Sequence, residues 1–178
     1  MPESLFLINQ VIHDLREDCD YRILWTSSSQ DSPSYWLRLP GGSNVPEEVS
    51  LGKLSEGIEA GRYSFAPDIW RPVKSGEAGE TALRRRDKAW DLIRDAVTNE
   101  PDIYDSHKRR TILLGIEAAT GTKVPNLYKY IGKYWRYGKI PDALLPKCSG
   151  FFCASTGTAG GKGFGPDPSV RRCSHPCP

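Results

Sequence analysis

Residues Asp105 to Gly138 carry the pattern that most restricts how this chain can fold, because two helical segments flank a single glycine. Apolar residues recur at helical spacing from about Ser106 to Thr120, and Asp105 or Ser106 is a suitable N-cap. Gly121 is expected to end this helix, since glycine readily adopts the left-handed conformation. A second helix is predicted to open near Val124-Pro125, because proline is tolerated in a first turn.

The second predicted helix has two distinct faces. Its apolar face is expected to be Leu127, Tyr130, Ile131 and Tyr134, and its polar face Asn126, Lys129, Lys133 and Arg136. From Ser106 to Lys139 there are eight basic residues and one acid, Glu117. A helix, a glycine turn and a helix with a basic outer face is typical of a helix-turn-helix, which lays its second helix in the DNA major groove. A solvated helical hairpin is the alternative.

The helix-turn-helix interpretation assigns two kinds of DNA contact. Asn126 and Lys129 are expected at base edges, with Lys133 near the groove, because Asn pairs with adenine and Lys with guanine. The remaining basic side chains are expected at phosphates, which position the protein without specifying sequence. They are Lys108, Arg109, Arg110, Lys123, Arg136 and Lys139.

The net charge of +2 conceals an uneven distribution. Residues 1–79 carry seven basic and twelve acidic side chains, whereas residues 80–147 carry fourteen and nine. An acidic N-terminal part and a basic central part are consistent with two modules, of which only the second binds phosphate groups.

The chain in order predicts an α+β protein. Strands are expected at Tyr21–Thr26 and Ser34–Leu39, and helices at Val49–Ala60 and Glu80–Asn99, while Leu5–Leu15 fits strand or helix. The Pro- and Gly-rich stretch 65–79 is the expected linker. The predicted organisation is a small β-rich module with a short helix (1–64), the linker (65–79), a three-helix helix-turn-helix domain (80–146) and a disordered Gly/Pro/Cys-rich tail (147–178).

No catalytic centre, metal site or cofactor is predicted from the residues. The tail holds Cys148, Cys153, Cys173, His175 and Cys177, but their spacing departs from usual zinc motifs, so disorder is the preferred interpretation. Glycines 160–165 lack the spacing of a phosphate loop. With no apolar run of about 18 residues and an acid at position 3, we expect neither a membrane span nor a signal peptide, and a cytoplasmic bacterial protein.

Several motifs in fixed order resemble one family. They are YRILW (21–25), RRDKAWDLI (85–93), EPDIYD (100–105), LYKYIGKYWRYG (127–138) and PDALLP (141–146). Together they are similar to the N-terminal DNA-binding part of TnsB-type transposases, which are related to phage Mu transposase. The resemblance covers about residues 6–146.

The resemblance implies binding of duplex DNA at transposon-end repeats, with other transposition subunits as possible partners. In the family, a separate DDE domain cuts and joins DNA with two magnesium ions. That domain is absent from this sequence, so we expect no enzyme activity from the chain itself and no Mg²⁺. The family pattern stops near Cys148, which suggests a truncated or frameshifted gene.

Two residues depart from the family pattern. Lys123 stands where members usually have a Ser or Thr N-cap, although Thr122 could substitute for it. Gly132 lies inside the second helix, where glycine costs up to about 1 kcal/mol relative to alanine.

Two rival functions remain open. The acidic N-terminal part could make the chain a protein-interaction module that docks another transposition subunit. A small helix-turn-helix repressor would instead be a dimer that binds a palindrome.

Overall fold

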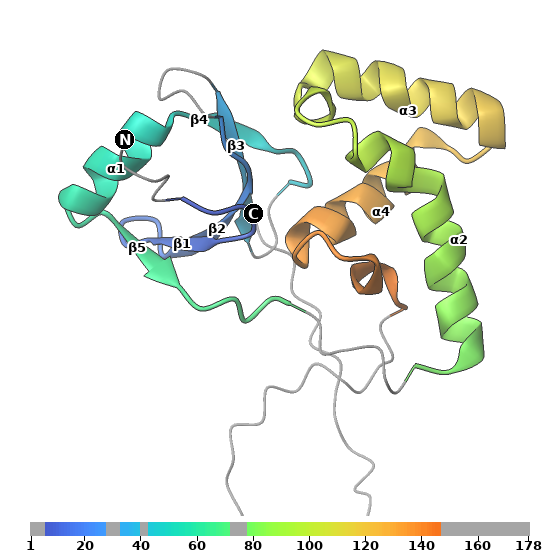
Figure 1. Cartoon of the computed structure of the whole chain (residues 1–178), viewed down its shortest axis with the longest axis horizontal. Coiled ribbons are helices and arrows are strands. Elements are labelled where there is room, and N and C mark those ends of the chain that lie inside the picture. Colours follow the sequence, from blue (N-terminus) through green and yellow to red (C-terminus); the bar gives the residue numbers. More distant parts are fainter. Residues whose placement is uncertain (1–5, 28–32, 40–42, 72–77, 147–178) are drawn as a thin grey trace, which may run out of the picture. The chain divides into compact units, whose positions relative to one another are not determined.

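The computed structural model describes residues 6–27, 33–39, 43–71 and 78–146 of the chain (Figure 1). An N-terminal antiparallel sheet precedes three longer helices, so the α+β class is confirmed. The first part contains β1 (Val11–Asp14), β2 (Cys19–Trp25), β3 (Ser34–Leu39), β4 (Glu47–Val49), α1 (Leu51–Glu59) and β5 (Tyr63–Ala66). The second contains α2 (Glu80–Val97), η2 (Asp102–Tyr104), α3 (Ser106–Thr120), α4 (Val124–Arg136) and η3 (Pro141–Leu144).

The sheet has the order β4-β3-β2-β1-β5, and all neighbouring strands are antiparallel. Side chains alternate between its faces, as the two-residue period of a strand requires. Ile23 and Trp36 lie in one apolar cluster with Leu51 and Leu54 of α1. Their neighbours Leu24 and Leu37 lie in the cluster formed by the helices. Both faces of the sheet are therefore buried at its centre.

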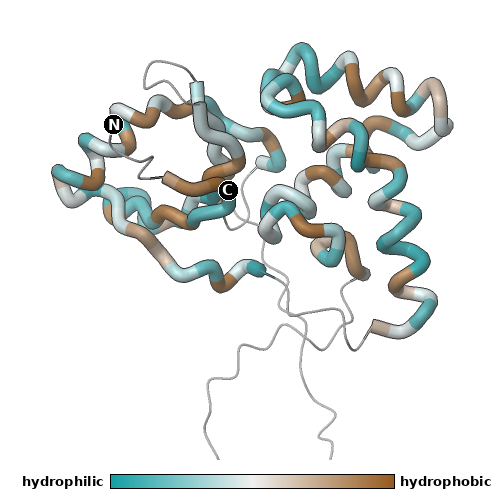
Figure 2. Tube along the Cα trace, viewed as in Figure 1, coloured by the Kyte–Doolittle hydropathy of each residue, from teal (hydrophilic) through white to brown (hydrophobic). Residues whose placement is uncertain are grey.

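The three helices α2, α3 and α4 contribute apolar side chains to one core. Apolar residues recur along each helix between hydrophilic ones (Figure 2). Ile93 of α2, Leu113 of α3 and Leu127, Ile131 and Trp135 of α4 are completely buried. A lone helical hairpin could not bury this much apolar surface, so α2 supports the pair α3–α4.

Polar contacts also join β2 to the region around α4. Arg22, completely buried, donates from Nε to the carbonyl of Arg136 (3.2 Å) and binds the Asp68 carboxylate with both Nη atoms (2.8 and 2.6 Å). The carbonyl of Leu24 accepts from the Tyr104 hydroxyl (3.3 Å) and from Lys139 Nζ (3.2 Å). These bonds fix the C-terminal end of α4 against the sheet.

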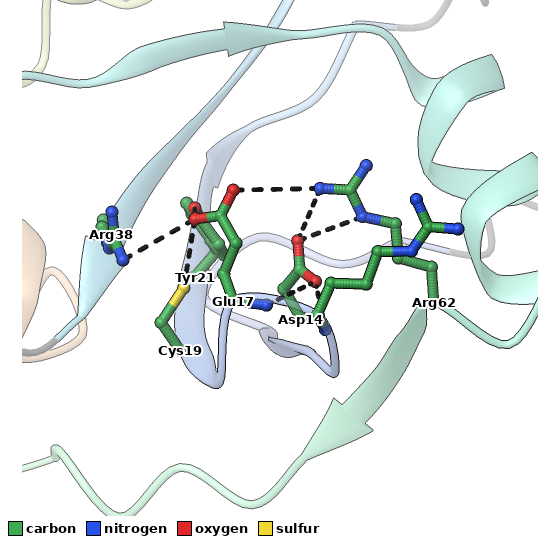
Figure 3. A network of polar contacts seen from close by, with 7 residues as sticks. Asp14, Glu17, Cys19, Tyr21, Arg38 and Arg62 are labelled. Carbon is green, nitrogen blue, oxygen red and sulfur yellow. Dashed lines mark hydrogen bonds and ion pairs between the residues drawn. The ribbon is translucent and has the colours of Figure 1, made fainter.

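A second polar network closes the turn between β1 and β2 (Figure 3). Asp14, 1% exposed, accepts from Arg62 Nε and Nη2 (3.2 and 2.8 Å) and from the backbone N–H groups of Arg16 and Glu17 (2.9 and 3.3 Å). Glu17 in turn accepts from the Tyr21 hydroxyl (3.1 Å). Because these polar groups bind each other, the network joins the turn to the start of β5 and has a structural role.

The strands differ from the sequence expectation at the sheet edges. The ambiguous stretch 5–15 contains β1, and the edge strands β4 and β5 were not predicted. Both are three or four residues long; β4 pairs with β3, the strand before it in sequence, and β5 pairs with the distant strand β1. Beyond β5, Asp68 binds Arg22 and Trp70 Nε1 donates to Asp20 (3.2 Å), so this part of the expected linker is anchored. The domain boundaries stay a prediction, and the tail 147–178 lies outside the described residues.

Candidate nucleic-acid interface

The helix-turn-helix is formed by α3, Gly121 and α4, and both ends of α3 and the start of α4 lie where the sequence predicted. Asp105 caps α3, and its Oδ1 accepts from the backbone N–H groups of His107 and Lys108 (both 2.9 Å). These hydrogen bonds, led by that from Lys108, hold the pKa of Asp105 below its ordinary value. Gly121 has φ +72°, the left-handed conformation, and its N–H donates to the carbonyl of Glu117 (2.8 Å).

The outer face of α4 presents Asn126 and Lys129 to solvent. Within the described part of the chain, neither side chain has a hydrogen bond or ion pair. Lys133 lies one turn further on and is half-buried. Spacings of three and four residues place these three side chains on one side of the helix. Because Lys129 and Lys133 lie on this face and residues 118–141 contain no Asp or Glu, this face carries positive charge.

The first turn of α4 is capped by a residue of α3, which the sequence pattern did not indicate. Lys123 occupies the N-cap position without a capping side chain, and Pro125 follows in the first turn. The Glu117 carboxylate takes that role: Oε2 accepts from the Val124 N–H (3.3 Å), and Oε1 lies 3.0 Å from Lys123 Nζ. Lys123 first, and then the Val124 N–H, hold the pKa of Glu117 below its ordinary value.

Lys108 and Arg110 lie on the exposed surface of α3, as phosphate contacts require. Lys108 Nζ pairs with Asp102 (2.7 Å), whose carboxylate raises the pKa of the lysine. Such an exposed pair contributes little to stability because water screens it, so a phosphate can displace it. Arg110 has no ion pair within the residues that the structure describes.

Arg109 differs from the sequence expectation, because it points into the protein. It is 2% exposed, and its Nη1 donates to the carbonyls of Ile103 and Tyr104 (3.2 and 2.8 Å). Its guanidinium also lies 5.9 Å from the centre of the Tyr128 ring. The buried guanidinium joins η2 to α3 and cannot reach a phosphate without leaving its carbonyl partners.

Lys139 and Arg136 are likewise used inside the protein. Lys139 Nζ binds the Glu100 carboxylate and the Leu24 carbonyl, and its side chain is 10% exposed. Arg136 Nη2 donates to Asn44 Oδ1 (2.8 Å). The sequence places these charges on a basic segment, but the structure directs them towards the sheet. Of the predicted DNA contacts, those that remain accessible are Asn126, Lys108, Arg110, Lys123, Lys129 and, half-buried, Lys133.

Gly132 has a packing function that helix propensity does not reveal. It is buried, and a Cβ at this position would lie 2.3 Å from Asn44 Cγ and 2.7 Å from Asn44 Cβ. The glycine lets the segment before β4 approach the helix backbone. Asn44 then reaches Arg136, one turn away.

Metal-binding side chains do not gather in the described part of the chain. In the four described ranges, no group of three or more His, Cys, Asp or Glu residues could hold a metal ion. The four tail cysteines and His175 lie outside those ranges. Nor is any helix in this part of the chain both long and apolar enough to span a membrane.

Comparisons with known proteins identify relatives of the helical part of the chain. Residues 86–147 match the family model described as the TnsB second domain. The chain is also 22% identical, over 144 residues and 80% of its length, to the transposon Tn7 transposition protein TnsB of Escherichia coli. It spans 20% of the length of that relative. These findings support a transposition-related DNA-binding role and confirm the resemblance that the motifs indicated: residues 86–147 are similar to a TnsB second domain, and most of the chain is similar to part of a TnsB-type transposase.

Proposed function

We propose that the chain binds duplex DNA in a sequence-specific manner at transposon ends, as the DNA-binding part of a transposition protein. In this proposal α4 enters the major groove. Asn126 and Lys129 contact base edges, and Lys133 lies near the groove. Lys108 and Arg110 contact phosphates, as Lys123 does when it leaves its ion pair with Glu117.

The observation that carries the proposal is the pair Asn126 and Lys129 on the second helix of a helix-turn-helix. Both are exposed, and no partner within the described chain occupies their polar groups. A side chain that reads a base must have its donors and acceptors available, and these two do. The helix is thirteen residues long, about 20 Å at 1.5 Å per residue, and a helix fits a groove about 12 Å wide.

The charge distribution adds a second argument. Lys129 and Lys133 have no acidic neighbour along residues 118–141, so the face would attract a polyanion. Lys108 and Arg110 lie near the start of α3, at the opposite end of that helix from the turn. The phosphate contacts would then bracket α4 and fix its orientation.

The test is selection of short random duplexes by the full chain, followed by fluorescence anisotropy on the selected duplex and a scrambled one. Lys129→Gln should lose about 1–3 kcal/mol on the selected duplex and less on the scrambled one. Lys53→Gln is the matched control, because Lys53 is also an exposed helical lysine but lies on α1.

Three outcomes of this selection distinguish reading of transposon ends, reading of another DNA sequence, and binding through charge alone. Enrichment of one sequence that also recurs in the DNA flanking the gene supports reading of transposon ends. Enrichment of a sequence that does not recur there would remove the transposon-end part and leave a DNA reader. Equal binding to all duplexes that disappears with salt would indicate only a basic surface, and the interaction module would become the better interpretation.

A further inference from the structure

The start of α4 is occupied by an acidic side chain of the protein itself. Glu117 belongs to the last turns of α3, yet its two carboxylate oxygens serve the next helix. One lies 3.0 Å from Lys123 Nζ and the other accepts from the Val124 N–H at 3.3 Å. The Glu117 side chain is 25% exposed and Lys123 is 76% exposed, so both remain within reach of a bound duplex.

The Lys123 ammonium and the Val124 N–H are groups that would otherwise be available to bind a phosphate. The first N–H groups of a helix and its dipole attract anions, and a lysine beside them adds a full charge. Glu117 satisfies both internally, and it is the only acid between Asp105 and Asp142. A phosphate that approached the start of α4 would have to displace this carboxylate or would be repelled by its negative charge.

We propose that Glu117 determines specificity: its carboxylate competes with DNA phosphates for Lys123 and the start of α4, and so weakens binding to unrelated DNA more than binding to the sequence that α4 reads. The inference rests on the proposed function. In a specific complex the first residues of the reading helix face base edges, whereas in a non-specific complex the protein rests on the phosphate backbone.

The expected size follows from counterion release. Each phosphate neutralised contributes a slope of about −0.9 in log K against log salt, which is roughly fivefold in affinity at about 0.15 M salt relative to 1 M. Removing the Glu117 charge frees Lys123 for one such contact. Binding to a scrambled duplex should therefore rise about fivefold and its salt slope should steepen by about 0.9, while binding to the selected duplex rises less.

The decisive variant is Glu117→Gln in the full chain, measured by anisotropy on both duplexes over a range of salt. The Gln carbonyl can still accept from the Val124 N–H, so the cap survives and only the charge is lost. Glu80→Gln is the matched control, since Glu80 also lies in the first turn of a helix and pairs with an exposed arginine, Arg84 (2.6 Å). Glu117→Ala, which removes both cap and charge, separates the two contributions.

Support for the inference is a lower ratio of selected to scrambled affinity in Glu117→Gln, a steeper salt slope, and no such change in Glu80→Gln. An unchanged ratio and slope in Glu117→Gln, with weaker binding and lower melting temperature only in Glu117→Ala, would overturn it and leave Glu117 as a structural cap. Equal gains on both duplexes would also overturn it. A wild-type chain that bound no duplex would refute the proposed function, and this inference with it.

Discussion

Gly132 gives the sharpest test of how α4 is held, because helix propensity and packing predict opposite results for one substitution. In an unconstrained helix interior, Gly→Ala stabilises a protein by up to about 1 kcal/mol. At Gly132 the new Cβ would lie 2.3 Å from Asn44 Cγ and 2.7 Å from Asn44 Cβ. The second of these atoms is attached to the backbone, so rotating the Asn44 side chain cannot relieve the overlap, and the segment before β4 must shift.

The magnitude can be worked from these contacts. Overpacking costs about 1–3 kcal/mol, and moving Asn44 also weakens its hydrogen bond to the Arg136 guanidinium, worth about 1 kcal/mol at a partly exposed site. Subtracting the gain in helix propensity leaves Gly132→Ala destabilised by about 1–3 kcal/mol. For a chain of this size the melting temperature should fall by about 2–4 °C per kcal/mol.

The assay is urea and thermal unfolding of Gly132→Ala beside two comparison variants. Gly115→Ala is the matched control, because Gly115 lies in α3 and a Cβ there would meet no described atom within 4 Å outside its own stretch of helix, so alanine should stabilise the protein by about 1 kcal/mol. In the background of Asn44→Gly, which removes the clashing atoms, Gly132→Ala should stop being destabilising. A Gly132→Ala variant as stable as Gly115→Ala would refute the packing argument.

Two further predictions concern charged side chains. Asp14→Asn should destabilise the protein by about 1–3 kcal/mol and make its stability fall less steeply as the pH becomes acidic. Burial alone would raise the pKa of Asp14, but hydrogen bonds from Arg62 and two backbone N–H groups lower it. The carboxylate therefore stabilises the fold above the unfolded-state pKa and loses this effect as pH falls through the folded-state pKa, which urea unfolding between neutral and acidic pH measures. Arg110→Gln should weaken binding to every duplex and reduce the salt slope by about 0.9 without a change in the melting temperature of the protein. Arg109→Gln should instead lower the melting temperature, because this side chain is buried against backbone carbonyls. The opposite pattern would show that Arg109 is the phosphate contact.

The local elements could be predicted from the sequence because their signals lie within a few residues of each other. The α3–α4 unit is of this kind. An Asp N-cap, a glycine with positive φ and a proline in the first turn define it, and each lies where its backbone geometry requires it. Most of the apolar face of α4 also follows from spacing, since Leu127 and Ile131 are completely buried, but Trp135, equally buried, was not assigned to it.

The rest depends on contacts between distant residues. Arg109 and Lys139 look like neighbouring charges on a basic segment, and only the folded chain brings them to the carbonyls of Tyr104 and Leu24. Counting charges cannot distinguish a guanidinium that faces solvent from one that joins two backbone segments. Capping of α4 by Glu117 was missed for a related reason, because the usual N-cap rule considers only the residue at the helix start.

The apolar cluster that includes both sheet and helix residues has a consequence for how the protein unfolds. Leu24 and Leu37 of the sheet lie in the same cluster as Ile93 and Trp135 of the helices. If either half came apart first, it would expose the other half's apolar side chains to water and leave the Leu24 carbonyl without its donors. We therefore expect that neither half has an independent melting transition and that the described chain unfolds as one cooperative unit.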